Sequence, residues 1–387
     1  MRKLKDVTER VRSNDGRMDL PTLTMSASSG WLDQKDRFSG DISGKEKKNY
    51  TLLKKGELSY NHGNSKLAKY GVVFSLTNYE EALVPRVYHS FKALENTSAD
   101  FIEYMFSTKL PDRELGKLVS SGARMDGLLN INYDDFMNIH ISIPNYEEQI
   151  LMSAFFRKLD ETIALHQRKL DRLKLLKQGY LHQLFPKNDE EVPSIRFAYF
   201  ENKWEQRKLG DLLTKNSKKN KDLNVTNVES VSNKTGFTKQ TEQFEDYSVA
   251  SADLSNYYVI TEKQFAYNPS RINVGSIAYK AVGDDKSVVS PLYVSFSTKK
   301  LLNDGYLWNW FKTTSFQSQR ERLSEGGVRD TLSFNQLSEM LINVPEYLEQ
   351  EKIGSFFKQM DDAIALYLSK LDKLKSIKQS LLQKMFI

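Results

Sequence analysis

The sequence predicts an α+β fold that the chain uses twice. Two globular α+β domains are each followed by one long helix, and the two helices are expected to pack as an antiparallel coiled coil. Three observations predict this fold: an internal repeat, an apolar periodicity within the repeat, and mixed strand and helix patterns in the segments between. Because the repeat relates the two halves of the chain, the fold is expected to have an internal pseudo-twofold axis.

The repeat is the strongest signal. Residues 144–186 (PNYEEQILMSAFFRKLDETIALHQRKLDRLKLLKQGYLHQLFP) and 345–387 (PEYLEQEKIGSFFKQMDDAIALYLSKLDKLKSIKQSLLQKMFI) align without a gap. Both copies begin with a P-x-x-x-E-Q element and carry Phe-Phe, Asp and Ile-Ala-Leu at matched positions. Agreement over the whole segment indicates a duplication.

Apolar residues recur within each copy in alternating steps of three and four, which is the a/d pattern of a coiled-coil seam. Lys177 and Lys378 interrupt the two seams at matched positions, where a polar residue can fix the register. Each helix is expected to be about 57 Å long at 1.5 Å per residue. The seam residues are Phe156, Leu159, Ile163, Leu170 and Leu173 in the first copy and Phe357, Met360, Ile364, Leu371 and Leu374 in the second.

The segments outside the two long helices contain both strand-like and helix-like sequence patterns. GVVFSLT from Gly71 and SIAYKAV from Ser276 are typical of strands, and SADFIEYMFST from Ser98 and DGYLWNWFKTTSF from Asp304 are typical of capped helices. The predicted organisation is a first globular domain at 1–143, a first helix at 144–186, a polar linker at 187–203, a second globular domain at 204–344 and a second helix at 345–387.

Composition narrows the class of protein. The chain has no Cys, which excludes disulfides and thiolate metal sites and fits a reducing compartment. The net charge of +6 points weakly to a polyanionic partner. No apolar run approaches the roughly 20 residues of a membrane helix, and the charged N-terminus is unlike a signal peptide. We therefore expect a cytoplasmic protein with no membrane contact.

No catalytic or metal site is expected. Asn268-Pro269-Ser270-Arg271 lacks the second Pro and the aromatic residue of an adenine methyltransferase motif, and GDISGKE from Gly40 has the wrong spacing for a phosphate-binding loop. The five histidines show no i, i+4 pair for zinc. The sequence therefore favours recognition over chemistry.

Two variable α+β segments alternate with two similar helices, and this order resembles the specificity subunits of type I restriction-modification enzymes over essentially the whole chain. The residues that carry the resemblance are Pro144, Glu148 and Gln149 and their matches Pro345, Glu349 and Gln350. One departure is that VPSIRFAYFENKWEQ precedes the second domain, whereas the first copy begins directly at its RKL element.

The resemblance implies that each globular domain is a target-recognition domain for one half of a bipartite DNA sequence. It implies that the helices set the spacer and dock two methyltransferase subunits. The partners would be double-stranded DNA, those two subunits and restriction/translocase subunits. S-adenosylmethionine, ATP and Mg²⁺ would be used by the partners, and this chain would bind no cofactor.

Candidate DNA contacts are residues with suitable donors in loop-like sequence. Residues that recur in both halves (Asn61 with Asn268, Arg124 with Arg329) are expected to contact phosphate or support loops, since repeated residues tend to maintain a shared fold. Unmatched Arg86 and Arg271 are expected to read bases. For each candidate the alternative is an ordinary solvated cation or a turn-forming Asn. The candidates are Tyr60, Asn61, Arg86, Arg124, Lys234, Lys239, Tyr267, Asn268, Arg271 and Arg329.

A second class of function fits the same features. A non-catalytic coiled-coil scaffold that binds other proteins would also show paired helices and a balanced charge. The alternation of variable domains with repeated helices favours DNA recognition.

Overall fold

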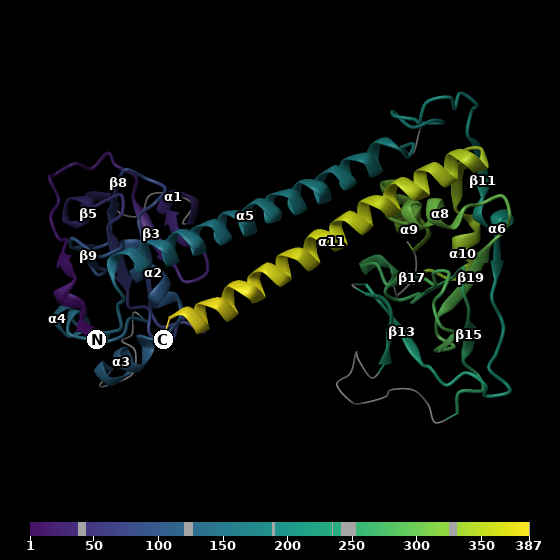
Figure 1. Ribbon diagram of the computed structural model, residues 1–387. Coiled ribbons are helices and arrows are strands. Elements are labelled where there is room, and N and C mark those ends of the chain that lie inside the picture. Colours follow the sequence, from purple (N-terminus) through teal and green to yellow (C-terminus); the bar gives the residue numbers. More distant parts are fainter. Residues whose placement is uncertain are drawn as a thin grey trace. The chain divides into compact units, whose positions relative to one another are not determined.

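The computed structural model describes residues 1–37, 44–119, 127–187, 190–233, 235–240, 253–324 and 331–386 (Figure 1). The chain forms two compact units. Unit 1 comprises Met1–Gln167 and Ser369–Ile387, and unit 2 comprises Arg168–Leu368. Each unit therefore contains one globular domain and a part of each long helix, so the helices do not form a separate body.

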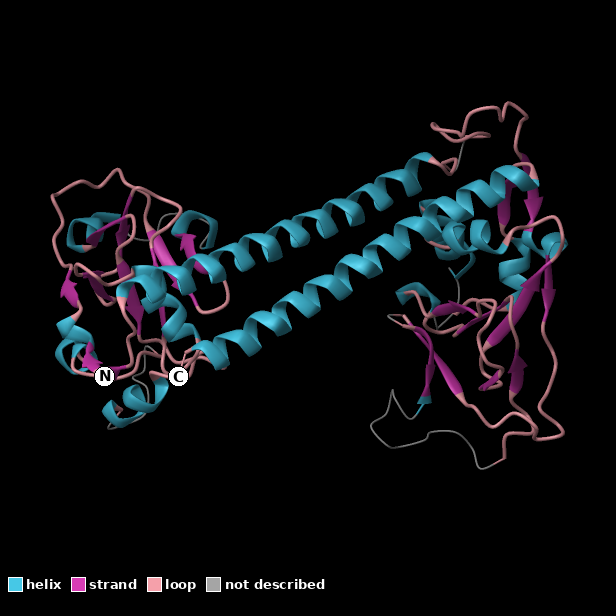
Figure 2. Cartoon of the chain, in the orientation of Figure 1, coloured by secondary structure: helices cyan, strands magenta, loops and turns pink. Residues whose placement is uncertain are grey.

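Unit 1 is built on an antiparallel four-stranded sheet with the order β2-β9-β6-β7. Strands are magenta in Figure 2. The pairs β1-β10, β3-β4 and β5-β8 complete the strands of unit 1. Its elements are β1 (Arg2–Lys3), η1 (Leu4–Asp6), β2 (Thr8–Arg10), β3 (Leu23–Ser26), β4 (Gly30–Asp33), α1 (Gln34–Arg37), η2 (Gly44–Asn49), β5 (Thr51–Lys54), β6 (Leu58–Asn61), β7 (Val72–Ser75), β8 (Glu81–Val84), β9 (His89–Ala93), α2 (Ala99–Ser107), α3 (Asp112–Leu118), α4 (Tyr133–Met137), β10 (His140–Ile141) and the first part of α5 (Tyr146–Gln183).

Unit 2 repeats this plan, with a four-stranded sheet in the order β12-β19-β16-β17 and the pairs β11-β20, β13-β14 and β15-β18. The predicted α+β class, used twice, is confirmed. Its elements are β11 (Glu205–Lys208), α6 (Leu209–Leu212), β12 (Leu213–Lys215), β13 (Glu229–Ser232), β14 (Gly236–Lys239), β15 (Tyr258–Ile260), β16 (Gln264–Tyr267), η3 (Ile272–Val274), β17 (Ile277–Tyr279), β18 (Ser287–Val289), β19 (Val294–Thr298), α8 (Asp304–Trp310), α9 (Thr314–Ser324), α10 (Phe334–Glu339), β20 (Leu341–Val344) and the first part of α11 (Tyr347–Met385).

The repeated Gln of the P-x-x-x-E-Q element joins each long helix to its domain. Gln149 Oε1 accepts a hydrogen bond from the Ser98 backbone N–H at 2.9 Å, at the N-terminus of α2. Gln350 Oε1 accepts one from the Asn303 N–H at 2.8 Å, at the N-terminus of α8. Both amides also donate to the carbonyl of the motif Pro, and both side chains are buried. The motif therefore satisfies backbone groups at a helix start that would otherwise be buried without partners.

The core of each unit combines its domain with both long helices. In unit 1 Phe386, just beyond α11, stacks on Phe101 of α2 with ring centroids 5.0 Å apart. In unit 2 Phe185, just beyond α5, lies 5.0 Å from the ring of Tyr306 in α8. The end of one helix therefore packs into the domain that the other helix follows, which requires the two helices to run antiparallel within each unit.

The ten predicted seam residues are all buried or half-buried along the two helices. Two matched ion pairs join the two helices. Lys378 Nζ lies 2.5 Å from Asp160 Oδ1 in unit 1, and Lys177 pairs with Asp361 in unit 2. The lysines that interrupt the seams thus each meet a carboxylate of the opposite helix.

None of the helices in the described ranges has the length and apolar character needed to span a bilayer. Within the same ranges, no three His, Asp or Glu residues are grouped so that they could hold a metal ion.

Candidate nucleic-acid interface

Three arginines gather on the surface of unit 1 and form what we call the arginine cluster: Arg10, Arg12 and Arg86. Arg10 ends β2, Arg12 follows it by two residues, and Arg86 lies in the loop between β8 and β9. The backbone brings them together, because β2 pairs with β9 and Val11 N–H donates to the Ser90 carbonyl at 3.0 Å. All three are exposed and line one cavity of about 330 Å³.

The electrostatics of the cluster are repulsive. Arg86, and then Arg10, lower the pKa of the Arg12 guanidinium from its usual value through like-charge repulsion. Arg10 lies over the ring of Tyr133, 4.0 Å from its centroid. Among the described residues, no carboxylate forms an ion pair with any of the three. The cavity is therefore an electropositive concavity.

Two histidine rings line the same cavity as the arginines. His62 and His89 stack with centroids 4.9 Å apart, and each bonds backbone carbonyls, His62 to Leu129 at 2.7 Å and His89 to Ile131 at 2.9 Å. Burial is the main cause that lowers the pKa of His89 to about 4. His89 is therefore uncharged at neutral pH and adds no charge to that of the arginines.

The expectation that Tyr60 and Tyr267 contact DNA is not met by their placement. Both side chains are 0% exposed and lie in the cores of their domains. Tyr60 stacks on Phe136 with centroids 4.3 Å apart and donates from its hydroxyl to the Tyr70 carbonyl at 2.7 Å. These tyrosines recur in both halves because the shared core needs them, so their role is packing.

Asn61 and Asn268 form the same local structure in the two domains. Asn61 Oδ1 accepts the Gly63 backbone N–H at 3.1 Å, and Asn268 Oδ1 accepts the Ser270 N–H at 3.0 Å. Each Asn side chain thereby stabilises the turn that leaves the central sheet. This arrangement matches loop support, one of the two roles expected for repeated residues.

Arg271 lies in the loop after β16. Its backbone N–H donates to the Asn268 carbonyl at 3.0 Å, while its side chain is exposed. The guanidinium forms no ion pair within the described part of the chain. Arg271 therefore has a free cationic side chain, as a base-reading residue requires.

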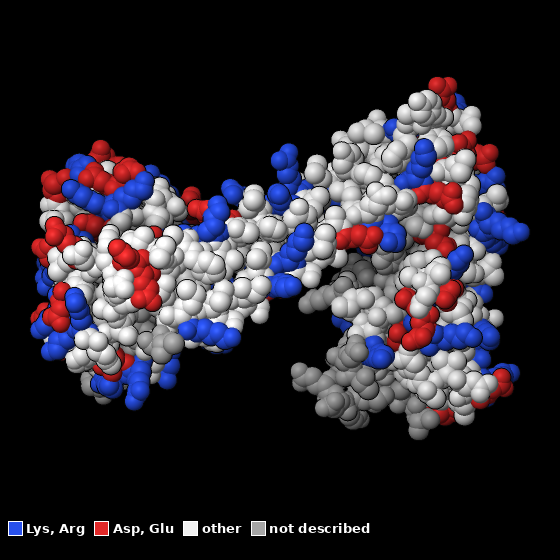
Figure 3. Space-filling view, viewed as in Figure 1, with Lys and Arg blue, Asp and Glu red and all other residues white. Residues whose placement is uncertain are grey.

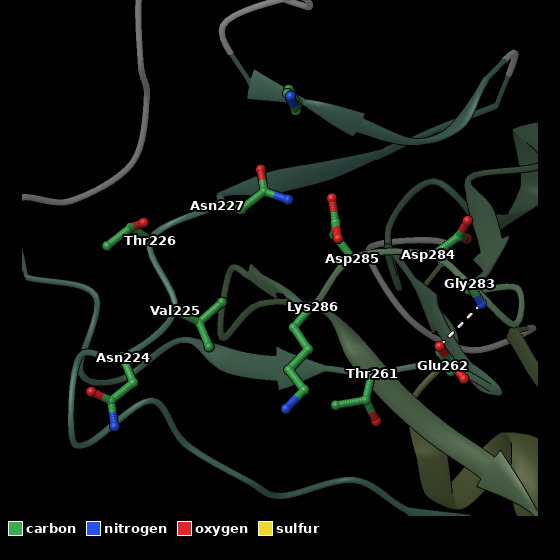
Figure 4. Close-up of a pocket in the computed structure, with 11 residues that line it drawn as sticks. Asn224, Val225, Thr226, Asn227, Thr261, Glu262, Gly283, Asp284, Asp285 and Lys286 are labelled. Atoms are coloured by element: carbon green, nitrogen blue, oxygen red, sulfur yellow. Dashed lines mark hydrogen bonds between the residues drawn. The ribbon is translucent and has the colours of Figure 1, made fainter.

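Lys239 ends β14 and lines a cavity of unit 2 that is about 1020 Å³ in volume. Figure 4 shows residues that line this cavity. Asp284, Asp285 and Glu262 line the same cavity, and Glu262 Oε1 accepts the Gly283 N–H at 3.0 Å. Among the described lining residues, three carboxylates stand against two lysines. This balance disfavours a phosphate there and weakens the case for Lys239 as a contact to the DNA backbone. Arg124, Lys234 and Arg329 lie outside the described residues.

Comparison with known proteins adds an independent observation. A family model described as the type I restriction modification DNA specificity domain matches the chain twice, at residues 2–175 and 201–376. The chain belongs to this family. The two matches coincide with the two halves of the internal repeat, so each half is one specificity domain.

Solved structures have the same fold as this specificity chain. One is a type I restriction-modification S subunit from M. genitalium, with a TM-score of 0.61 and 14% identity. The alignment covers 100% of this chain and 95% of the S subunit. Another is a chain from a structure that describes complex assembly and conformational transition of the type I R-M system, with a TM-score of 0.50 and 13% identity. That alignment covers 100% of this chain and 96% of the other. No curated protein sequence matches significantly.

The sequence reasoning missed Arg10 and Arg12 of the first specificity domain. One signal was present, because arginines two residues apart at a strand end point to the same side. Their relation to Arg86 was hidden, since it depends on the pairing of β2 with β9. Charge over a wider area is balanced, and Figure 3 shows cations and carboxylates interspersed on the face drawn. The cluster is thus a local feature.

Proposed function

We propose that this chain is the DNA sequence-specificity subunit of a type I restriction-modification complex, in which each specificity domain reads one half of a bipartite target. The observation that carries the proposal is the duplication. The same domain occurs twice, and each copy is followed by a helix that packs antiparallel to the other within each unit. A chain with this pseudo-twofold order matches the twofold symmetry of a DNA backbone.

The helices, in this proposal, set the spacer between the half-sites and dock two methyltransferase subunits. The chain itself performs no chemistry, and restriction/translocase subunits join the same complex. S-adenosylmethionine, ATP and Mg²⁺ are used by those partners in the cytoplasm. The exposed apolar residues Ile150, Leu151 and Phe155 on the first half of α5 support a docking role for this helix.

The test is selection from a random duplex library by the chain together with its methyltransferase subunits. We expect enrichment of two short defined sequences separated by a fixed non-specific gap. The Arg271→Ala variant should relax one half-site only, at a cost of about 1–3 kcal/mol if the contact is bidentate. A library that stays unenriched would favour the protein-binding scaffold instead.

A further inference from the structure

The arginine cluster brings positive charges together, and among the described residues no carboxylate pairs with them. Arg17, in the same unit, shows the usual alternative: it pairs with Asp15 at 2.7 Å and Glu81 at 2.6 Å. Arg12 and Arg86 have no such partner among the described residues, although they line one cavity and repel each other. Folding alone gives no reason to hold these two cations together.

The second specificity domain shows that the shared fold forms without them. The bond from Val11 N–H to the Ser90 carbonyl is repeated by Asn216 N–H to Ser295 at 2.8 Å, so the two sheet edges are equivalent. In that register Lys215 occupies the position of Arg10 and lies 5.7 Å from the ring of Phe334, as Arg10 lies over Tyr133. A cation that lies over an aromatic ring at this strand end is therefore common to both domains.

The other two arginines are not shared. Pairing of Arg10 with Phe91 and of Lys215 with Phe296 aligns the two edges residue by residue. Counting along each strand and loop from these pairs, Arg12 is replaced by Ser217 and Arg86 by Pro291. The edge of the second domain thus keeps the stacked cation and loses the two unpaired ones.

We propose that Arg12 and Arg86, with Arg10 beside them, bind a backbone phosphate of the DNA, and that this contact belongs to the first specificity domain alone. The inference rests on the proposed function and deepens it. It makes the first domain the half that anchors the duplex electrostatically. At the matched positions the second domain carries Ser217 and Pro291, so the two unpaired guanidinium groups have no counterpart at these positions.

The chemistry favours a phosphate over a base edge. A guanine edge accepts one arginine in a bidentate fork, and a second cation beside it would remain unpaired. A phosphate presents two charged oxygens that accept several guanidinium donors at once, and its negative charge relieves the repulsion within the cluster. Base reading, expected for Arg86 from sequence, is therefore less suited to its surroundings than backbone binding.

The experiment measures binding of the full chain to a 30-base-pair duplex of arbitrary sequence from about 50 to 200 mM salt. The Arg12→Gln/Arg86→Gln variant should bind roughly 10- to 100-fold more weakly at the lowest salt, because it loses two charge-assisted contacts. Its log–log salt slope should be shallower by about one, because the variant no longer neutralises that phosphate. Lys5→Gln/Arg113→Gln removes the same charge from exposed positions outside the cavity and should have a smaller effect.

Two further measurements separate the possible results. The double variant should select the same sequences as the unmodified chain, and at low salt it should melt no earlier, since a repulsion has been removed. An unchanged salt slope, or an altered preference in one half-site, would overturn the phosphate assignment while the unmodified chain still binds DNA. If the unmodified chain binds no duplex, the proposed function fails as well.

Discussion

At the scale of single residues, matched positions of the repeat meet different surroundings. Glu349 is 0% exposed, and Arg196 holds it with Nε 3.0 Å from Oε1 and Nη2 2.7 Å from Oε2. Trp204 Nε1 donates to the same carboxylate at 3.2 Å. Glu148, the matched residue of the first copy, is exposed. The lead-in segment noticed as a departure in the sequence therefore buries and compensates a charge in unit 2.

Arg196→Met should destabilise unit 2 by about 3–5 kcal/mol, because it leaves Glu349 buried without its cation. The tryptophan fluorescence of denaturant unfolding measures this, since Trp204, Trp308 and Trp310 all lie in unit 2. Arg196→Met combined with Glu349→Leu should recover most of the loss. Lys203→Met, which breaks an exposed ion pair with Glu191, is the matched control and should cost under about 1 kcal/mol. Equal losses in the two single variants would contradict the prediction.

His89 should make unit 1 sensitive to acid. Its pKa in the folded chain is about 4, below the ordinary 6.5, because burial disfavours the charged ring. The unfolded chain therefore binds a proton first as the pH falls, so stability is lost between about pH 6.5 and pH 4, by up to about 3 kcal/mol. Hydrogen exchange of the β2-β9-β6-β7 amides measures this loss.

The second domain provides the control for that measurement, because Val294 begins β19 where His89 begins β9. His89→Val should flatten the acid dependence of the first sheet and leave that of the second sheet unchanged. If the variant and the unmodified chain lose protection in parallel from pH 6.5 to pH 4, another group carries the acid sensitivity.

Residue roles were the least predictable part of the site. Tyr60 and Asn61 stood out in the sequence because they recur, and the structure places them in the core and in a turn. Recurrence in a duplicated chain marks what the fold needs. Arg12 and Arg86 do not recur and are distant in sequence, so only the folded sheet edge brings them into one cavity.

At the scale of elements, the polar residues that interrupt the seam of the long helices contribute to their register, as do the apolar residues of the seam. Leu170 and Leu371 are each 2% exposed at matched seam positions. Lys177 and Lys378 replace apolar residues and reach carboxylates of the facing helix. Any axial slip of the helices would separate both ion pairs, so the pairs disfavour alternative registers.

A double-mutant cycle between Lys378→Met and Asp160→Asn should give a coupling energy of about 1 kcal/mol, since the pair is only partly exposed and crosses between helices. The Asn side chain keeps an acceptor for the Tyr104 hydroxyl, which lies 2.8 Å from Asp160 Oδ2. The exposed pair of Lys358 and Asp362 within α11 is the matched control, with an expected coupling near 0.3 kcal/mol. A coupling for the first pair no larger than the control would mean that it does not hold the register.

Secondary-structure elements could be predicted from the sequence wherever a hydrophobic periodicity extends over many residues. The alternating steps of three and four extend over the whole repeat, and the structure has helices at Tyr146–Gln183 and Tyr347–Met385. Strands of two to five residues leave a weak pattern, and pairings such as β2 with β9 join residues far apart in sequence. Sheet order follows from the packing of the whole domain, which no local window of sequence contains.

At the scale of the whole molecule, duplication gives the chain two specificity domains. Both long helices are shared between the units, and the core of each unit includes the C-terminal end of the long helix that begins in the other unit. Neither unit therefore has a complete core when one helix is removed. In the proposed function the same two helices also determine how far apart the two half-sites lie on the DNA.

Lengthening both helices together should lengthen the spacer. Four residues inserted after Arg168 and four after Ser369 fall at matched points between the two ion pairs, so Lys177–Asp361 and Lys378–Asp160 can still form. Each insertion adds about one turn, or about 6 Å, which corresponds to one or two base pairs at about 3.4 Å each. Both half-sites should stay unchanged while the selected gap grows by that amount, as read by sequencing the sites that the variant complex selects.

The control inserts two residues at each of the same points. Two residues turn a helix by about 200°, which carries the apolar seam away from its partner and should destabilise the chain. A stable four-residue variant that selects the original gap would show that the helices join the domains without measuring the DNA. Because the insertions touch neither the arginine cluster nor Arg271, a change in either half-site would instead mean that the domains do not read their sequences independently.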